Sequence, residues 1–280
     1  MQINTSSLIT YFCLVDDIIK QIPIENKRQK PLQTDSELIF IAIISCFFFK
    51  CNYKMAVGFS NLTKLTKVPI SYNRFIKRIN NKSKLIKVIM EIISNLSEEY
   101  DFEKTYIVDA KSIQLAKNYR KPKNFKDSIE HKGYSASKKL FYTGFQLHLI
   151  ISLNKKIPIC FEILPAKIGE REALKTLSKR IQPNSTILGD KGYVGNDLEQ
   201  YLKDIDINLV TLKRKHSLKK LGLQHNPIDL IRKRHFIEKF FADLSFIFPD
   251  NRNYVSINGL INKLNLSLLA LSLKNFSKQQ

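Results

Sequence analysis

Acidic residues are scarce in this sequence of 280 residues, which has 25 Asp plus Glu against 46 Lys plus Arg and a formal net charge of +21. A charge of this size affects solubility, steering and polyanion binding rather than the fold, and the natural polyanions are nucleic acids and anionic membranes. The alternative is a merely basic protein, enriched in Lys, Asn and Ile by the codons of an A+T-rich genome. We favour a nucleic-acid partner. In so basic a chain, an acidic residue beside an apolar stretch requires an explanation.

Cysteines are also few, and Cys13, Cys46, Cys51 and Cys160 follow no CxxC or Cys/His zinc spacing. Buried free thiols are therefore expected, as in a cytoplasmic protein. The N-terminus lacks the positive region, clean apolar run and small-residue cleavage site of an export signal. The most apolar run, at 38–49, has 12 residues, whereas a membrane-spanning helix needs roughly 20. We expect a core helix there and no membrane partner.

The first part of the chain has a helical pattern, with apolar residues at three- and four-residue intervals. The segments with this pattern are 8–22, 35–62 and 71–100. Asp35 and Ser71 are the expected N-caps, and polar segments containing proline separate the helices. The 44% hydrophobic content is enough for a core. We predict a helical N-terminal module at 1–100 that binds DNA and a catalytic domain at 101–280.

From about residue 103 the pattern changes to that of strands, rich in Ile, Leu, Val and Phe. Strands are predicted at 104–116, 145–154, 156–167, 185–193 and 208–215. Helices are predicted at 169–182, 195–205, 227–248 and 258–276. Short links favour antiparallel pairing of the first three strands, and helical crossovers favour parallel pairing of the later ones. This succession resembles the ribonuclease H-like fold, an α/β class with a mixed five-stranded sheet and flanking helices, here preceded by an all-helical module.

Three acids occupy positions that matter in such a sheet. Asp109 is embedded in the strand "TYIVDAKSI", where an ionised carboxylate is costly unless it is paired or binds a cation. Asp190 closes the strand in "ILGDKGYVG", and Gly192 lets the backbone turn there. Glu238 lies one helical turn after Arg234. The alternatives are a solvent-facing strand residue, an ordinary Asp-x-Gly turn and an intrahelical ion pair with Arg234.

The three acids together indicate a metal site. Mg²⁺ prefers carboxylate oxygens and keeps several waters, and two such ions can activate a water or a 3′-hydroxyl and stabilise the leaving oxygen of a phosphodiester. We therefore predict that Asp109, Asp190 and Glu238 hold two Mg²⁺ ions, with Mn²⁺ as a substitute.

The chain resembles the DDE transposases of bacterial insertion sequences, most closely the insertion-sequence 982 family. The segments that carry this resemblance are "IVDAKSI", "HKGYSASKKLFYTGFQLHLI", "ILGDKGYVG" and "RKRHFIEKFFADL". The resemblance implies that Asp109, Asp190 and Glu238 form the catalytic triad. Related enzymes carry a Y-x2-R-x3-E-x6-K pattern around the glutamate. Arg234 and Glu238 match it, whereas Ile231 and Ser245 stand at the Tyr and Lys positions.

The resemblance also implies a function. The expected protein binds terminal inverted repeats and catalyses metal-dependent DNA cleavage and strand transfer. Its partners would be double-stranded transposon ends and target DNA, bound by a homodimer or higher assembly in the nucleoid of the bacterial cytoplasm. One alternative is a ribonuclease H-like nuclease without strand transfer. The other is a catalytically silent DNA-binding protein derived from a transposase.

Basic residues interleaved with aromatic ones are candidates for contacts to phosphates and bases. Around the second strand and the acids these are Lys138, Lys139, Tyr142, Lys191, Tyr193 and Arg234. A second basic run, before the Glu238 helix, contributes Lys213, Arg214, Lys215, Lys219 and Lys220. For the first group the alternative is a solvated loop with Phe141 and Phe145 in the core.

One N-terminal helix and two histidines provide the remaining candidates. "PISYNRFIKRI" could be a recognition helix that presents Arg74, Lys77 and Arg78 to a DNA groove, or simply the polar face of a bundle helix. His148 lies in an apolar strand and is expected to be a hydrogen-bonded core residue. His235 could orient a phosphate or a water near Glu238.

Overall fold

The chain forms two compact units. The computed structural model describes residues 3–23, 32–99, 101–117, 131–135, 139–212, 228–248 and 256–278. Unit 1 comprises residues 1–96, 243–249 and 254–280, and unit 2 comprises 97–242 and 250–253. The sequence-based division at 1–100 and 101–280 assigned the whole C-terminal part to the second domain. Residues 243–249 and 254–280 instead group with the N-terminal helices.

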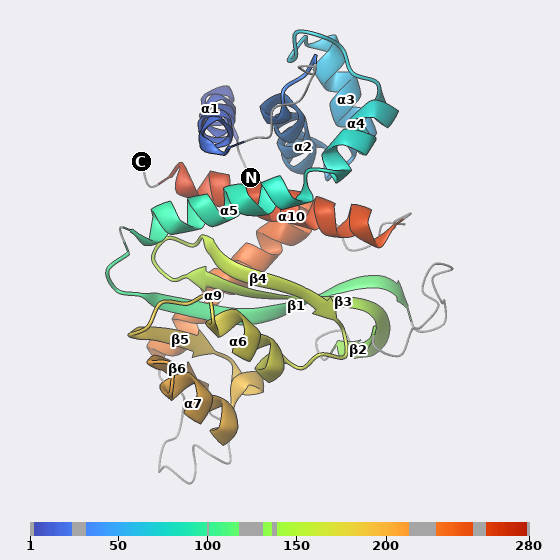
Figure 1. Ribbon diagram of the computed structural model, residues 1–280. Coiled ribbons are helices and arrows are strands. Elements are labelled where there is room, and N and C mark those ends of the chain that lie inside the picture. Colours follow the sequence, from blue (N-terminus) through green and yellow to red (C-terminus); the bar gives the residue numbers. More distant parts are fainter. Residues whose placement is uncertain are drawn as a thin grey trace. The chain divides into compact units, whose positions relative to one another are not determined.

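Unit 1 is helical. Its helices are α1 (Thr5–Gln21), α2 (Asp35–Phe49), α3 (Tyr53–Leu62), α4 (Tyr72–Asn80), most of α5 (Ser83–Glu98) and α10 (Ile257–Phe276), labelled in Figure 1. The middle of α10 is buried on every side, from Leu264 to Leu273. A helix that is apolar all round must be covered all round. Contacts with α1, α2 and α4 supply that cover, which explains why α10 belongs to this unit.

Two predicted long helices are each divided. The predicted helix at 35–62 is α2 followed by α3, because Lys50 and Cys51 adopt left-handed backbone with φ of 48° and 59°. The predicted helix at 71–100 divides into α4 and α5. No single helix of the described residues has the length and apolarity to span a membrane. α2 and α3, bent by 111°, pass that test only as a pair.

One helix cap and one cysteine differ from the predictions made from the sequence. Ser71 caps α4 as predicted, but the cap of α2 is Thr34 rather than Asp35, in a capping box with Glu37. All four cysteines are free, and three are buried as expected. Cys13 is exposed, because it lies on the solvent side of α1.

Unit 2 is built on a six-stranded mixed sheet. Its strands are β1 (Thr105–Lys117), β2 (Lys132–Ser135), β3 (Leu140–Ser152), β4 (Pro158–Pro165), β5 (Ser185–Gly189) and β6 (Ile207–Thr211). Their order is β2-β3-β1-β5-β6, and β4 also pairs with β3. β3 runs antiparallel to β1, β2 and β4, whereas β5 runs parallel to β1 and β6. The predicted antiparallel and parallel pairings are confirmed, and β2 is a sixth strand that the sequence reading missed.

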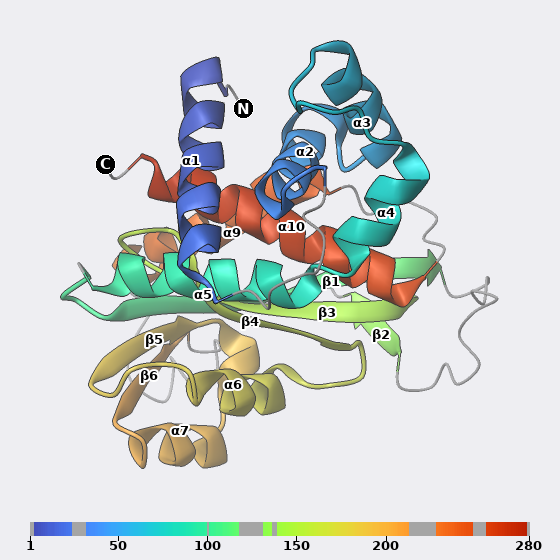
Figure 2. The same ribbon diagram turned by 45° about the horizontal axis from the view of Figure 1, so that its top comes forward.

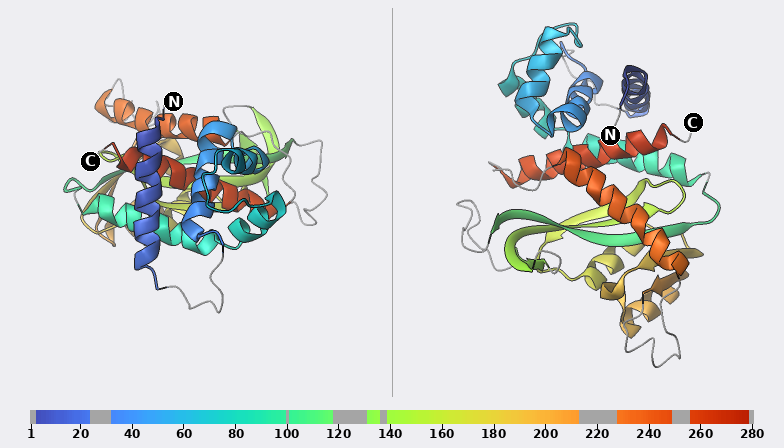
Figure 3. Two further views of the ribbon diagram at one scale, coloured as in Figure 1. Left: turned by 90° about the horizontal axis from the view of Figure 1, so that it is seen from above. Right: turned by 180° about the vertical axis from the view of Figure 1, so that it is seen from behind.

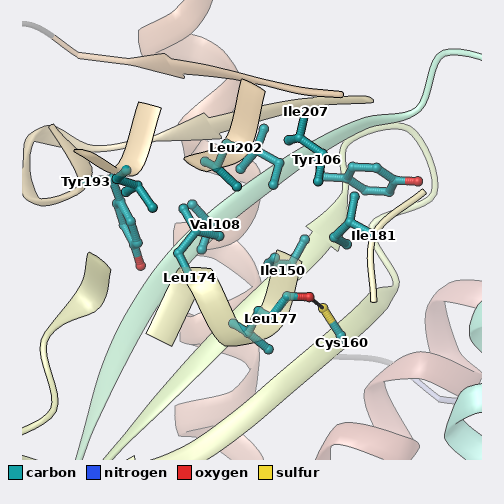
Figure 4. Packing of buried hydrophobic residues seen from close by; sticks show 12 residues of the cluster. Tyr106, Val108, Ile150, Cys160, Leu174, Leu177, Ile181, Tyr193, Leu202 and Ile207 are labelled. Atoms are coloured by element: carbon teal, nitrogen blue, oxygen red, sulfur yellow. Dashed lines mark hydrogen bonds between the residues drawn. The ribbon is translucent and has the colours of Figure 1, made fainter. Parts of the chain in front are cut away.

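Helices flank this sheet. α6 (Glu170–Ser178) and α7 (Asn196–Lys203) lie beside β4, β5 and β6 on one face (Figure 2). Seen from behind, the unit 2 part of α9 (Ile228–Ile247) crosses the other face (Figure 3). On the α6 face, Val108, Ile150, Leu174 and Leu202 belong to one buried cluster (Figure 4). This cluster fixes α6 on the sheet, and with it the residues at the start of that helix.

Candidate active site

Asp109 and Asp190 lie at the same end of two adjacent parallel strands. β1 and β5 pair in the register Ile107 with Leu188. Asp109 and Asp190 each follow two residues later, so extending that register by two residues sets them opposite one another. The ends of neighbouring parallel strands are where an α/β sheet places its chemistry. The structure therefore brings these two predicted acids together.

Backbone N–H groups hold both carboxylates. The Ala110 N–H donates to Asp109 Oδ1 at 2.8 Å. The Gly192 N–H donates to Asp190 Oδ1 at 2.7 Å, and Asp190 is the N-cap of a short 3₁₀ turn, η1 (Lys191–Tyr193). Asp190 thus ends the strand by capping a turn, as an Asp-x-Gly sequence favours. Each bond leaves the second carboxylate oxygen without a backbone donor in the described contacts.

Arg234 links the third acid to the first. Its Nη2 lies 3.7 Å from Asp109 Oδ2 and 3.5 Å from Glu238 Oε1. The intrahelical pair with Glu238 is therefore present, but the same guanidinium also reaches β1. His235 Nδ1 lies 3.1 Å from Glu238 Oε2 and so contacts this acid as well. Glu238 is half-exposed, and α9 brings it to the sheet end that carries Asp109.

A fourth acid, Glu170, enters the same region from α6. A Cβ placed on Gly192 would lie 1.8 Å from Glu170 Oε2 and 3.0 Å from Asp190 Oδ1. The two carboxylates therefore face the same small volume beside Gly192. Sequence reasoning missed Glu170, since an acid in the first turn of a helix is ordinary. The one signal was its position directly after Gly169, at the start of the helix that follows the third predicted strand.

The acids perturb one another. Burial raises the pKa of Asp109 to about 6; the Ala110 N–H and Arg234 oppose this, and the charges of Asp190 and Glu238 add to it. Burial likewise raises the pKa of Glu170 to about 7, with Asp190 and Asp109 adding to the effect and Arg234 opposing it. Desolvation and like charges both disfavour ionised carboxylates. Four acids thus share one region in which Arg234 is the cation that lowers the pKa of Asp109 and Glu170.

The donor set suits a hard divalent cation. Asp109, Glu170, Asp190 and Glu238 offer carboxylate oxygens, the ligands that Mg²⁺ and Mn²⁺ prefer. Within the part of the chain that the structure describes, no group of three or more His, Cys, Asp or Glu side chains is placed so that it could hold a metal ion together. Arg234 lies between two of the acids and supplies positive charge there. The residues fit a divalent cation by their chemistry and by the repulsion that a cation would relieve.

The predicted DNA contacts divide by exposure. Lys139, Lys191, Arg74 and Lys77 are exposed. Tyr142 and Tyr193 are 1% and 0% exposed, so their side chains offer no surface to DNA in this structure. Arg78 donates to the Gln33 carbonyl at 2.8 Å and is also a packing residue. Six further candidates lie outside the described residues, namely Lys138, Lys213, Arg214, Lys215, Lys219 and Lys220.

Two aromatic residues beside Tyr142 are exposed instead. Tyr134 on β2 and Phe141 on β3 are 51% and 59% exposed, and their ring centroids lie 4.9 Å apart. β3 begins at Leu140, and Phe141 and Tyr142 point to opposite faces of the hairpin. The alternative of a solvated loop placed both Phe141 and Phe145 in the core; Phe145 is buried, but Phe141 is exposed. His148 is buried, yet neither ring nitrogen has a hydrogen-bond partner among the described residues.

The fold and the positions of the acids together define a class of protein. A mixed sheet in which an antiparallel meander continues into parallel strands, with acids on β1, after β5 and on α9, is a ribonuclease H-like arrangement. The family model described as "Transposase DDE domain" matches residues 99–248, more than half of the chain. The chain therefore belongs to this family and is a transposase.

A solved structure of a transposase agrees with this fold. The structure is similar to the piggyBac transposase in its synaptic complex with hairpin DNA, with a TM-score of 0.51 and 10% identity over 99% of this chain and 74% of that one. It also matches a pre-cleavage Mos1 transpososome, with a TM-score of 0.27 and 10% identity over 100% of this chain and 98% of that one. The second score is too low to carry an argument. No curated protein matches the sequence.

Proposed function

We propose that this transposase is a divalent-metal-dependent DDE enzyme whose catalytic triad is Asp109, Asp190 and Glu238, and that it is most similar to the insertion-sequence 982 family. The observation that supports it most directly is the parallel register of β1 and β5, in which Ile107 pairs with Leu188, so that Asp109 and Asp190 each follow two residues after the last pair. Arg234, in contact with both Asp109 and Glu238, brings α9 into the same centre. The family match supplies the reaction class, which is cleavage and joining of DNA.

Two Mg²⁺ ions, or Mn²⁺ in their place, are the proposed cofactor. Held by Asp109, Asp190 and Glu238, such ions would supply activation of a water or a 3′-hydroxyl and stabilisation of the leaving oxygen of the phosphodiester. The residues of this chain contribute fixed ligands, because the Ala110 and Gly192 N–H groups hold Asp109 and Asp190. Glu238 is held from two sides, by Arg234 and His235.

The proposed substrate is double-stranded DNA, at first a transposon end and then a target. The net charge of +21 favours polyanion binding. Of the described candidates, Lys139 and Lys191 are exposed in unit 2, whereas Arg74 and Lys77 are exposed on α4. We propose that α4 and its neighbours read the terminal inverted repeat, and that the six basic candidates outside the described residues contact phosphates. A homodimer or higher assembly in the bacterial cytoplasm would bring two ends together.

The test is cleavage of a labelled duplex that carries the terminal repeat of the element encoding the protein, with Mg²⁺ or Ca²⁺. The variants are Asp190→Asn, which keeps the shape and removes the charge, and the matched control Asp197→Asn, an exposed acid in the first turn of α7. We expect wild type and Asp197→Asn to nick at the repeat boundary with Mg²⁺, and Asp190→Asn to bind the duplex without cutting.

The rival functions give different results. A nuclease without strand transfer would cut the repeat but fail to join a 3′-hydroxyl end to a target plasmid. A catalytically silent DNA-binding protein would protect the repeat and cut nothing with either metal. Equal cutting by wild type and Asp190→Asn would remove Asp190 from the triad.

A further inference from the structure

The packing of helix α6 against the sheet fixes the position of Glu170. It is the first residue of α6, after Gly169, which caps the helix without a side-chain hydrogen bond. Ala173, Leu174 and Leu177 on the same helix are buried against the sheet. This packing sets the rotation of α6, so the first turn lies beside η1, with which α6 is in contact. The core therefore holds Glu170 next to the turn that carries Asp190.

The Glu170 carboxylate occupies the space that a side chain at position 192 would need. Its Oε2 lies 1.8 Å, and Asp190 Oδ1 3.0 Å, from the point where a Cβ of residue 192 would stand. Two carboxylates that close repel each other strongly when both are ionised. Glu170 is partly buried and forms no hydrogen bond to the described residues, and the charge of Arg234 offsets this cost only in part. A cation between the carboxylates would remove it.

A buried hydroxyl at the same place indicates a missing ligand independently. The Tyr193 side chain is 0% exposed, and its hydroxyl has no hydrogen-bond partner among the described residues. The ring is part of the buried cluster, as Figure 4 shows. Burial raises the pKa of the Tyr193 hydroxyl, and the charges of Glu170, Asp109 and Asp190 add to this effect. An unpaired buried hydroxyl is costly, so a partner is expected there when the site is filled.

We propose that Glu170 is a fourth carboxylate of the catalytic centre, which holds a divalent cation together with Asp190, and that the Tyr193 hydroxyl donates a hydrogen bond within the filled centre. The inference rests on the proposed function because it shares Asp190 as a ligand. It adds a residue from α6 to a centre otherwise built from β1, the turn after β5, and α9. Asp190 precedes the η1 turn and Glu170 lies beside it, so these two carboxylates would hold the cation.

The experiment measures Mn²⁺ binding to the full-length protein by calorimetry without DNA, and thermal unfolding with and without Mn²⁺. The variants are Glu170→Gln, Asp190→Asn and the matched control Glu172→Gln, an exposed acid in the same helical turn. We expect Glu170→Gln to weaken Mn²⁺ binding by about 10- to 100-fold, the range seen when groups around a metal are removed. Glu172→Gln should bind Mn²⁺ as wild type does.

The metal-free protein gives a second readout that a purely structural role of Glu170 would not produce. Removing one of two repelling charges should raise the melting temperature of the metal-free Glu170→Gln protein and reduce the further rise caused by Mn²⁺. A residue that only stabilised α6 would give a lower melting temperature and unchanged Mn²⁺ affinity. Tyr193→Phe should lose part of the Mn²⁺-induced rise and have a higher metal-free melting temperature than wild type, because it removes the unpaired hydroxyl.

The outcomes separate this inference from the proposed function. If Asp190→Asn loses Mn²⁺ binding and DNA cleavage while Glu170→Gln keeps the affinity of the Glu172→Gln control, the role of Glu170 is refuted and the triad stands. If wild type binds no Mn²⁺, both proposals are wrong. Should Glu170→Gln be less stable than wild type, Glu170→Asp decides the matter: it keeps the charge but retracts it, and wild-type Mn²⁺ affinity in that variant would also refute the role.

Discussion

Asp35 in unit 1 and Asp109 in unit 2 are carboxylates of similar burial, with side chains 10% and 18% exposed, but their surroundings are opposite in charge. Asp35 meets two cations, Lys82 Nζ at 2.5 Å and Arg78 Nη2 at 3.6 Å. Asp109 meets Arg234 and the like charges of Asp190 and Glu238. In a chain with so many more cations than acids, a local excess of acid is the exception.

The difference separates an acid that stabilises a fold from an acid held for another purpose. The cations beside Asp35 balance its negative charge, and so they lower the free energy of the folded unit 1 without any added ligand. The acids around Asp109 raise the free energy of unit 2 unless a cation from solution joins them. A protein that is marginally stable keeps such a cost only where function requires it.

The largest expected effects come from neutralising Asp109 and, in a separate variant, Asp35. Asp109→Asn should reduce DNA cleavage by more than about 100-fold, beyond what changes around a metal usually cause, and should raise the stability of the metal-free protein. Asp35→Asn should destabilise the protein by about 1–3 kcal/mol, because it leaves Lys82 and Arg78 without their partner. Urea unfolding and the cleavage assay on the same samples measure both effects. If both variants changed the stability of the protein in the same direction, the contrast between Asp35 and Asp109 would be refuted.

The pH dependence of stability should show the same excess of acid. In the folded protein the pKa of Asp109 is raised to about 6 and that of Glu170 to about 7. The folded state therefore holds more protons than the unfolded state above the ordinary carboxyl range. The free energy of unfolding of the metal-free protein should fall as the pH rises from about 4 to 7.

Urea unfolding between pH 4 and 7.5 in the presence of a chelator measures this slope. Asp109→Asn and Glu170→Gln should each flatten it, while Glu172→Gln should keep the wild-type profile. If neither variant changes the slope, the pKa values of these two carboxyls are not raised in the folded protein. Added Mn²⁺ should remove the slope in wild type, since a bound cation favours the ionised carboxylates.

A glycine tests the geometry without changing any charge. In Gly192→Ala the new methyl group would overlap the Glu170 carboxylate, which can swing away because it ends a flexible side chain. Mn²⁺ affinity should fall by several-fold to about 10-fold, approaching the effect of Glu170→Gln. Gly58→Ala is the control, because a Cβ there meets nothing within 4 Å. It should stabilise α3 by roughly 0.5–1 kcal/mol and leave Mn²⁺ affinity unchanged. Wild-type affinity in Gly192→Ala would place Glu170 outside the centre.

The sequence predicted those parts of unit 2 in which local pattern and tertiary structure agree. The alternation around Asp109 predicted β1, and the apolar run ending at Asp190 predicted β5, because a strand in a buried sheet needs such residues. The strand β2 was not predicted, since Lys132–Ser135 is too short and polar and pairs only because β3 begins early at Leu140. The same early start reverses the expected roles of Phe141 and Tyr142.

The candidate site was predicted to a lesser extent. Asp109 and Asp190 stand out because an acid interrupts an apolar strand or ends it. Glu170 begins an amphipathic helix, where acids are common, so only its distance from Gly192 distinguishes it from Glu172. The grouping of α10 with unit 1 was equally hidden, since an apolar helix has no preference for one core until the partner helices are in place.

The smallest expected effect concerns the cations around the acid cluster. Lys191 follows Asp190 directly and is exposed, so it can contact a phosphate without neutralising the carboxylates. Lys191→Ala should weaken binding to any duplex by a few-fold and reduce the slope of log affinity against log salt by about 1. Lys203→Ala, on the exposed side of the last turn of α7, is the control and should change neither quantity.

Fluorescence anisotropy at several salt concentrations, with the terminal repeat and with a scrambled duplex, separates the possible results. An equal loss on both duplexes means that Lys191 contacts phosphate, as the excess of cations in this chain suggests. A loss on the repeat alone would make Lys191 a reader of sequence. An unchanged slope would place the DNA backbone away from η1. In that case the acid cluster would be reached from another side, and the contrast between the two units would concern metal binding alone.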